Sequence, residues 1–218
     1  MKLALFDLDN TLLNIDSDHA WGEFLISEGL VDPVRHRQIN DQFYEDYKAG
    51  KLDPIAYNEF VFEFLTQHSD EELKALHDRF MQTVIAPQMR PEGAKIIQAH
   101  LSLGHTVVGI TATSDFITTP IFHAFGIHQI IATQAEYVDG HYTGKVVGVP
   151  CYQTGKITRL ESWLAMQEAP VEEAWAYSDS INDRALLEYA THPIAVNPDD
   201  QLLALAQEKG WRIADWSF

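Results

Sequence analysis

The sequence predicts an α/β fold in which a parallel sheet carries helices on both faces. From about residue 91 onward, short apolar runs alternate with amphipathic stretches, which is the pattern of strands connected by helices. A first apolar run, Leu3–Phe6, is typical of a buried central strand. Between these two regions, residues 16–86 show helical patterns only. We therefore expect an all-helical insertion after the first strand.

Four helices are predicted inside the insertion, because glycines, a proline and a capping box mark their ends. Gly29 and Gly50 would end the first two helices, Asp53-Pro54 would begin the third, and Ser69–Glu72 is a capping box for the fourth. Their apolar positions are Trp21, Phe24 and Leu25; Phe43, Tyr44 and Tyr47; Ile55, Phe60, Phe64 and Leu65; and Leu73, Leu76 and Phe80. We expect a core domain of residues 1–15 and 87–218 and a helical cap domain of residues 16–86.

The remaining elements alternate as a parallel sheet requires, apart from one hairpin signal at Asp139-Gly140. One predicted helix follows Pro91–Gly93, runs through Ile96, Ile97 and Leu101 and is ended by Gly104. The other predicted helices are Asp115–Phe125, Lys156–Met166, Asn182–Ala190 and Asp199–Glu208. The predicted strands are Thr106–Ile110, Ile130–Ala132, Trp175–Ser178, Pro193–Val196 and an edge strand at Trp211–Ala214.

Composition excludes several classes of protein. The chain has 218 residues and a formal net charge of −17, which argues against nucleic acid or an anionic membrane as a partner. The single Cys151 excludes an internal disulfide framework and fits a reducing compartment. No apolar run is long enough to span a bilayer, and Asp7 interrupts the N-terminal run before a signal peptide could form. We expect a cytoplasmic protein, and composition leaves its oligomeric state open.

Polar and acidic residues follow three of the predicted strands. Asp7 and Asp9 follow the first, Thr111 follows the strand that ends at Ile110, and Asp179 and Asp183 follow the strand that ends near Tyr177. Ligands of open α/β sheets bind at the carboxyl ends of the strands, so these turns should meet in one crevice. Four carboxylates there would repel one another. A hard divalent cation resolves this, and Mg²⁺ suits a site that also takes phosphate oxygens.

At this point a resemblance becomes specific. The run Asp7-Leu8-Asp9-Asn10-Thr11 resembles the DxDxT motif of the haloacid dehalogenase superfamily of phosphohydrolases. The second, third and fourth motifs of that superfamily are matched, in order, by Thr111, by Lys156, and by Asp179 and Asp183 with Asn182 between them. The resemblance covers nearly the whole chain. It implies a Rossmann-like core with a cap inserted between the first two motifs.

The resemblance also implies roles for the acidic residues. Asp7 would attack phosphorus and form an aspartyl-phosphate, and Asp9 would act as general acid and then as general base. Mg²⁺ would bind the Asp7 carboxylate, the Asp9 main-chain carbonyl and Asp179, while Asp183 would hold a metal-bound water.

Further roles concern the phosphoryl group, whose oxygens would be held by Thr111, the Ala112 main-chain amide, Lys156 and Asn182. Stabilisation of the phosphoryl charge in this way usually makes the largest contribution to catalysis of phosphoryl transfer. A helical cap over the site would exclude water and macromolecules. We therefore expect a small, soluble phosphorylated metabolite as substrate.

The hairpin before Lys156 resembles the phosphoserine phosphatase branch of the superfamily. That branch carries an acid nine residues after the nucleophile, which contacts the substrate amine; this position is Asp16 here, shorter than the usual Glu. The branch usually has Ser-Gly-Gly in its second motif, where this chain has Thr111-Ala112-Thr113. The resemblance implies an amine-bearing substrate such as phosphoserine or histidinol phosphate. Asp16 also precedes a helix, so capping is an equally good interpretation.

Other interpretations stay open at this stage. A phosphotransferase or phosphomutase would share every motif, and a non-catalytic phosphate-binding protein could retain the same residues. A dehalogenase has no need of the acid that Asp9 supplies. For single residues, Thr111, Asp179 and Asp183 could cap helices, and Lys156 could lie on the surface.

Overall fold

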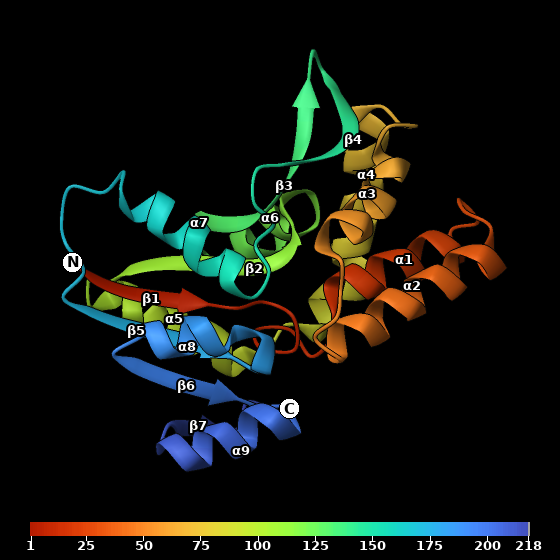
Figure 1. Ribbon diagram of the computed structural model, residues 1–218. Helices are drawn as coiled ribbons and strands as arrows, with labels where there is room; N and C mark the ends of the chain where they lie inside the picture. The colour runs from red at the N-terminus through yellow and green to blue at the C-terminus, as the bar shows by residue number, and fades with distance from the viewer. Residues whose placement is uncertain (218) are drawn as a thin grey trace.

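The computed structural model describes residues 1–217, and its sheet confirms the predicted α/β class. The strands in that range are β1 (Lys2–Phe6), β2 (Thr106–Ser114), β3 (Gln129–Val138), β4 (His141–Val147), β5 (Glu173–Ser178), β6 (His192–Val196) and β7 (Arg212–Ala214). They form one sheet in the order β4-β3-β2-β1-β5-β6-β7 (Figure 1). Neighbouring strands are parallel except β3 and β4, which form the predicted hairpin.

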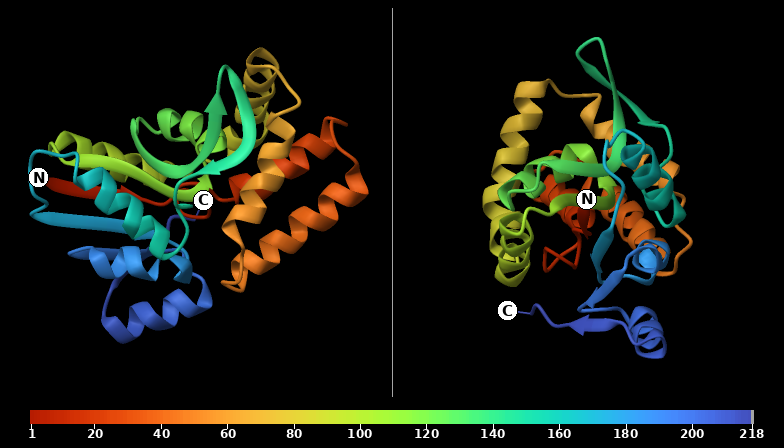
Figure 2. Two further views of the ribbon diagram at one scale, coloured as in Figure 1. Left: turned by 45° about the horizontal axis from the view of Figure 1, so that its top comes forward. Right: turned by 90° about the vertical axis from the view of Figure 1, so that its left-hand side faces the viewer.

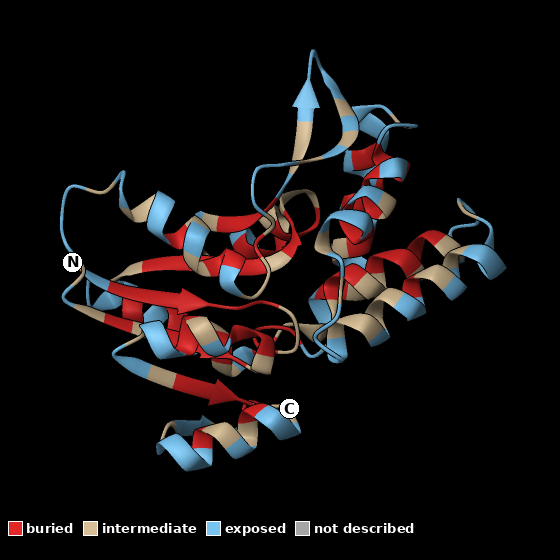
Figure 3. Cartoon of the chain, in the orientation of Figure 1, coloured by how far each residue is buried: buried red, intermediate tan, exposed pale blue. Residues whose placement is uncertain are grey.

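Helices cover both faces of the sheet (Figure 2). They are α5 (Pro91–Ser102) and α6 (Asp115–Ala124) on one face, and α7 (Thr154–Leu164), α8 (Arg184–Tyr189) and α9 (Asp200–Lys209) on the other. Successive side chains of β1 point to opposite faces, as strand geometry requires. Ala4 and Phe6 belong to the cluster that includes α5 and α6, whereas Leu3 and Leu5 belong to the cluster that includes α7, α8 and α9. The central strand is therefore buried on both sides (Figure 3).

Between β1 and β2 the regular structure within residues 16–86 is helical, as predicted. It consists of α1 (Ser17–Ser27), α2 (Pro33–Lys48), α3 (Pro54–Leu65), α4 (Asp70–Phe80), a π-helical turn (Met81–Ile85) and a 3₁₀ turn (Ala86–Gln88). The capping box at Ser69 and Glu72 is present. Trp21 packs against Phe24, Phe64 and Phe80, so α1, α3 and α4 share an aromatic core beside the carboxyl edge of the sheet (Figure 1).

Several element boundaries differ from those predicted, and three of them lie near the candidate site. Strand β2 continues to Ser114 instead of ending at Ile110, because its register with β3 shifts there and Ser114 pairs again with Thr133. The predicted helix at Asn182 begins as a 3₁₀ turn over Ile181–Asp183, and α8 starts only at Arg184. Helix α7 begins two residues before Lys156. These three differences set the positions of Thr113, Asn182 and Lys156.

A buried arginine fixes the loop that follows β1. The Arg90 guanidinium donates hydrogen bonds to the carbonyl oxygens of Leu13 (3.1 Å) and Trp216 (3.0 Å) and to Asn14 Oδ1 (2.8 Å). It thus joins the start of α5, the loop after β1 and the C-terminal segment. Within residues 1–217, no helix combines the length and apolarity needed to cross a membrane.

Candidate active site

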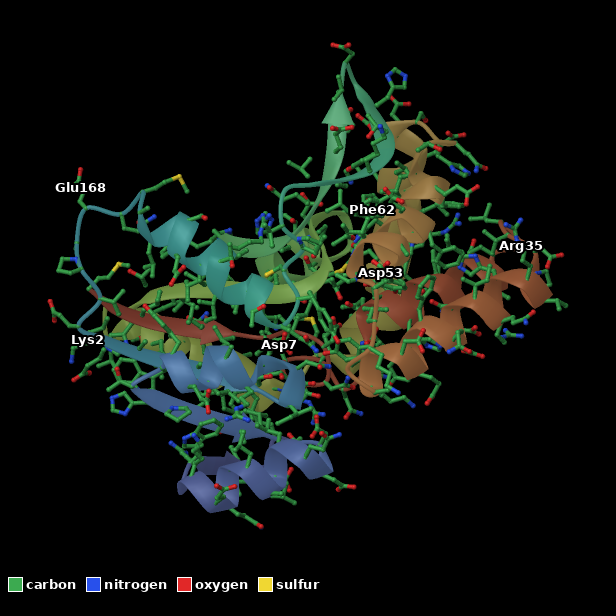
Figure 4. The ribbon with its side chains drawn as sticks, viewed as in Figure 1. Lys2, Asp7, Arg35, Asp53, Phe62 and Glu168 are labelled. Atoms are coloured by element: carbon green, nitrogen blue, oxygen red, sulfur yellow. The ribbon has the colours of Figure 1, made fainter. Side chains whose placement is uncertain are left out.

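Asp7 lies at the carboxyl end of β1, on the side that faces the helices α1–α4 (Figure 4). Lys156, the third residue of α7, places Nζ 2.7 Å from Asp7 Oδ1 and 2.6 Å from Asp183 Oδ2. The Ser178 hydroxyl at the end of β5 also donates to Asp183 Oδ2, at 2.8 Å. The Lys156 side chain is only 3% exposed, so the interpretation of Lys156 as a surface lysine is wrong.

Thr11 holds a second pair of carboxylates beside each other. Its hydroxyl oxygen lies 3.2 Å from Asp7 Oδ2 and 3.1 Å from Asp179 Oδ1, and it accepts a hydrogen bond from the Asp179 amide at 3.0 Å. A hydroxyl carries one proton, so Thr11 donates to one carboxylate at a time. The structure thus brings Asp7, Asp179 and Asp183 together around β1 and β5.

Asp9 is held by two donors from different segments. The main-chain amide of Ser17 donates to Asp9 Oδ1 at 2.6 Å, and the Thr113 hydroxyl donates to Asp9 Oδ2 at 2.8 Å. Thr113 lies where the register of β2 shifts, and such bulges redirect side chains next to active sites. Sequence reasoning had not assigned this role to Thr113. No local pattern in the sequence indicates it, because the contact depends on the register shift of β2.

The structure also tests the capping interpretations. Ser114, and not Thr111, caps α6, and the Asp183 side chain makes no capping hydrogen bond to α8. Asp16 does cap α1, because its carboxylate accepts from the His19 amide at 2.8 Å. Asp16 also lines the pocket described below. Its position is therefore compatible with both interpretations made from the sequence.

Burial shapes the electrostatics of the site. It raises the pKa of Asp7 to about 7, with the Asp183 and Asp9 charges adding to the effect and Lys156 opposing it. Burial, followed by the Asp16 charge, raises the pKa of Asp9 to about 7. Burial opposes the charged form of Lys156, but the Asp183 and Asp7 charges outweigh it and raise the pKa of Lys156. The carboxylates outnumber the cation that neutralises them, so the site favours additional positive charge.

The donor types here suit a hard divalent cation such as Mg²⁺, which prefers carboxylate and carbonyl oxygens. Within residues 1–217, no group of three or more His, Cys, Asp or Glu side chains is arranged to hold a metal. The motif implies a different set, in which only Asp7 and Asp179 contribute carboxylates and Asp9 contributes its main-chain carbonyl. Thr11 holds the two carboxylates beside each other, so the residues present fit such an ion.

A pocket lies between this edge of the sheet and the helices α1–α3. Thr111, Ala112 and Thr113 line it from β2, and Tyr44, Tyr47 and Tyr57 line it from α2 and α3. Four aspartates complete the polar wall: Asp7, Asp9, Asp16 and Asp18. Asp18, the second residue of α1, had not been singled out from the sequence.

Asn182 is not among the residues that line this pocket. Its side chain donates to the main-chain carbonyl of Tyr47 at 3.1 Å and accepts from Gln153 Nε2 at 3.0 Å. It thus connects the end of α2 to the segments before α7 and α8. Thr111 and Ala112, by contrast, line the pocket, and their contact with a phosphoryl group stays a prediction.

Comparisons with known proteins identify the family. The family model of haloacid dehalogenase-like hydrolases matches residues 4–188. A histidinol-phosphatase of Neisseria meningitidis is 44% identical over 219 residues, with 99% of each chain covered. Phosphoserine phosphatase SerB1 of Mycobacterium tuberculosis is 30% identical, over 98% of this chain and 70% of that protein.

Solved structures share the same architecture. A protein of unknown function from Bordetella pertussis has a TM-score of 0.93 at 42% identity, with 99% of each chain covered. A substrate-bound phosphoserine phosphatase has a TM-score of 0.70 at 20% identity, which concerns the fold alone; it covers 98% of this chain and 92% of that chain. From its motifs, its fold and these matches, we conclude that the chain belongs to the haloacid dehalogenase-like hydrolase family.

Proposed function

We propose that the protein hydrolyses a small phosphomonoester, with Mg²⁺, through an aspartyl-phosphate formed at Asp7. The protein is an enzyme of the phosphatase type, as its family and its relative at 44% identity support. The observation that carries the mechanistic proposal is the buried contact of Lys156 Nζ with both Asp7 and Asp183. It places a fixed positive charge beside the proposed nucleophile, where a phosphoryl group would bring negative charge.

The chemistry follows from the placement of the two acids. A carboxylate oxygen of Asp7 attacks phosphorus, and the bond from phosphorus to the ester oxygen breaks. Asp9 gives its proton to that oxygen, which leaves as an alcohol. Asp9 then takes a proton from water, whose oxygen attacks phosphorus and releases phosphate and free Asp7. The raised pKa of Asp9 supports its role as general acid, because a substantial fraction of the Asp9 carboxyl groups stays protonated near neutral pH.

The remaining residues bind the substrate and orient the reacting groups. Thr111, the Ala112 amide and Lys156 hold the phosphoryl oxygens, and Asn182 acts as a positioning residue between α2 and the core. Asp7, the Asp9 main-chain carbonyl and Asp179, with Asp183 nearby, would hold Mg²⁺, which would supply positive charge to the phosphoryl group.

The helical block, residues 16–86, acts as a cap over a core of residues 1–15 and 87–218. Because α1–α3 cover the pocket, the leaving group should be small. We propose an amine-bearing leaving group that contacts Asp16, as in phosphoserine or histidinol phosphate, and a cytoplasmic location. The names of the two relatives support this class of substrate.

The test is phosphate release from a panel of small phosphomonoesters, each measured with Mg²⁺ and with a chelator. We expect release that requires Mg²⁺ and is fastest for amine-bearing esters. Transfer of phosphate to an added alcohol in preference to water would instead identify a phosphotransferase. Tight binding of Mg²⁺ and a phosphate analogue without any turnover would identify a phosphate-binding protein.

A further inference from the structure

The charge of the pocket wall restricts the leaving group more than the motif does. Among the described residues, the lining side chains include four aspartates and no Lys, Arg or His. Lys156 is not among the lining residues, and its Nζ atom already contacts the carboxylates of Asp7 and Asp183. A leaving group that carried its own carboxylate would therefore lie among acidic side chains, without a Lys, Arg or His of the wall to pair with. Burying such an unpaired charge is strongly unfavourable.

Asp18 adds an acceptor that the motif does not account for. The residue is only 7% exposed, and its Oδ1 atom has no hydrogen-bond partner among residues 1–217. An acidic residue in the first turn of a helix is favoured by the helix dipole, but that role requires neither burial nor an unpartnered oxygen. A buried oxygen without a donor carries a desolvation penalty, and binding an N–H group would relieve it.

Asn58 provides a second acceptor of this kind on the same pocket. It lies on α3, is 2% exposed, and donates its amide hydrogen to the Pro54 carbonyl at 2.7 Å. Its Oδ1 atom has no hydrogen-bond partner among the described residues. Helices α1 and α3 thus each present one buried, unpartnered acceptor to the pocket. A ligand that satisfies both must offer several N–H donors.

We propose that Asp18 and Asn58 form a subsite for a second nitrogen-bearing group of the leaving group, so that the enzyme selects phosphate esters of basic amino alcohols without a carboxylate. The inference rests on the proposed phosphatase function. The inference goes beyond the proposed function, because a site with Asp16 alone would accept any primary amine. A leaving group with an amine and a second N–H-bearing ring would satisfy Asp16, Asp18 and Asn58 together.

The first experiment uses the unmodified protein and compares kcat/KM for four phosphate esters. Histidinol phosphate has an amine and an imidazole, phosphoethanolamine has an amine only, phosphoserine adds a carboxylate, and p-nitrophenyl phosphate is the reference without nitrogen donors. We expect histidinol phosphate to exceed phosphoethanolamine, and phosphoethanolamine to exceed phosphoserine, by about tenfold or more each. Equal or faster turnover of phosphoserine would overturn the inference and leave the phosphatase function intact.

The second experiment measures the ratio of kcat/KM for histidinol phosphate to that for p-nitrophenyl phosphate. We expect Asp18→Asn to lower this ratio by about 10- to 100-fold, mainly through KM, because an amide cannot form the ion pair that the carboxyl group of Asp18 can form with the ring. Asp78→Asn, at an exposed aspartate of α4 outside the pocket, should leave the ratio unchanged. An equal loss toward both esters would indicate a structural role for Asp18 and overturn the inference. Absence of turnover of every ester by the unmodified protein would refute the proposed function itself.

Discussion

Lys156 Nζ lies 2.7 Å from Asp7 Oδ1, although 149 positions separate the two residues in the chain. The contact is buried, with 3% of the Lys156 side chain and 8% of the Asp7 side chain exposed. It forms because α7 packs against the face of the sheet next to β1, with its first turn at the carboxyl edge. A lone carboxylate at this depth would be unfavourable, so Lys156 stabilises the ionised nucleophile.

Replacing this lysine should affect both activity and stability. Lys156→Met leaves Asp7 and Asp183 buried without their shared cation, so we expect kcat to fall by at least about 100-fold. The free energy of unfolding should fall by about 3 kcal/mol, because carboxylates would be left uncompensated. Phosphate release and urea unfolding measure the two effects. Lys95→Met, which removes only an exposed pair with Glu92, should change neither, and similar behaviour of the two variants would refute the role of Lys156.

The hydroxyl of Thr113 should matter to catalysis through Asp9. Thr113→Val keeps the shape of the side chain but removes the donor 2.8 Å from Asp9 Oδ2. We expect kcat to fall by about tenfold with KM nearly constant, because the general acid is less well oriented. Steady-state kinetics of Thr113→Val measure this effect, and Thr158→Val, at an exposed position of α7, is the control. Unchanged kcat in Thr113→Val would show that the hydrogen bond has no part in the reaction.

Arg90 is predicted to be a structural residue and not a substrate-binding one. Arg90→Met leaves the carbonyl oxygens of Leu13 and Trp216 without their donor, so we expect a loss of about 3 kcal/mol in the free energy of unfolding. Denaturant titration measures this loss. Arg79→Met, which removes an exposed ion pair with Glu28, should lose less than about 1 kcal/mol. Comparable losses in both variants would contradict the assignment.

His100 should make the fold sensitive to acid. Burial, followed by the His105 charge, lowers the pKa of His100 to about 4, below its value of 6.5 when exposed. The unfolded chain therefore binds this proton first, so the stabilisation is complete above about pH 6.5 and declines as the pH falls toward 4. Urea unfolding at pH 7 and pH 5 should show a smaller pH-dependent loss in His100→Gln than in the unmodified protein. An equal loss in both proteins would show that other groups cause it.

The sequence was sufficient to predict the α/β sheet, the helical insertion and the meeting of Asp7, Asp179 and Asp183. These follow from local patterns, because a strand that ends in a polar turn places its residues at one edge of the sheet. The contact of Thr113 with Asp9 depends on the register shift of β2 near Ile110, which no local pattern encodes.

Residues of the pocket wall were harder to predict. From the sequence, Asp18 is an ordinary acidic residue in the first turn of a helix. Only the packing of α1 against β2 and α3 shows that it is buried. Asn182 lies between Asp179 and Asp183 in the fourth motif, and for this reason the sequence predicts that it binds the phosphoryl group. The 3₁₀ turn that precedes α8 directs its side chain toward Tyr47 instead.

The most direct test of the account is phosphate release by Asp7→Asn, measured with saturating Mg²⁺ and the best substrate of the panel. Asparagine has nearly the same shape as aspartate but is a poor nucleophile, so we expect the rate to fall by at least about 1,000-fold. Asp115→Asn is the matched control, since Asp115 is a partly buried aspartate at the same edge of the sheet but outside the pocket. Asp7→Asn with near-normal turnover would contradict the proposal that Asp7 is the nucleophile.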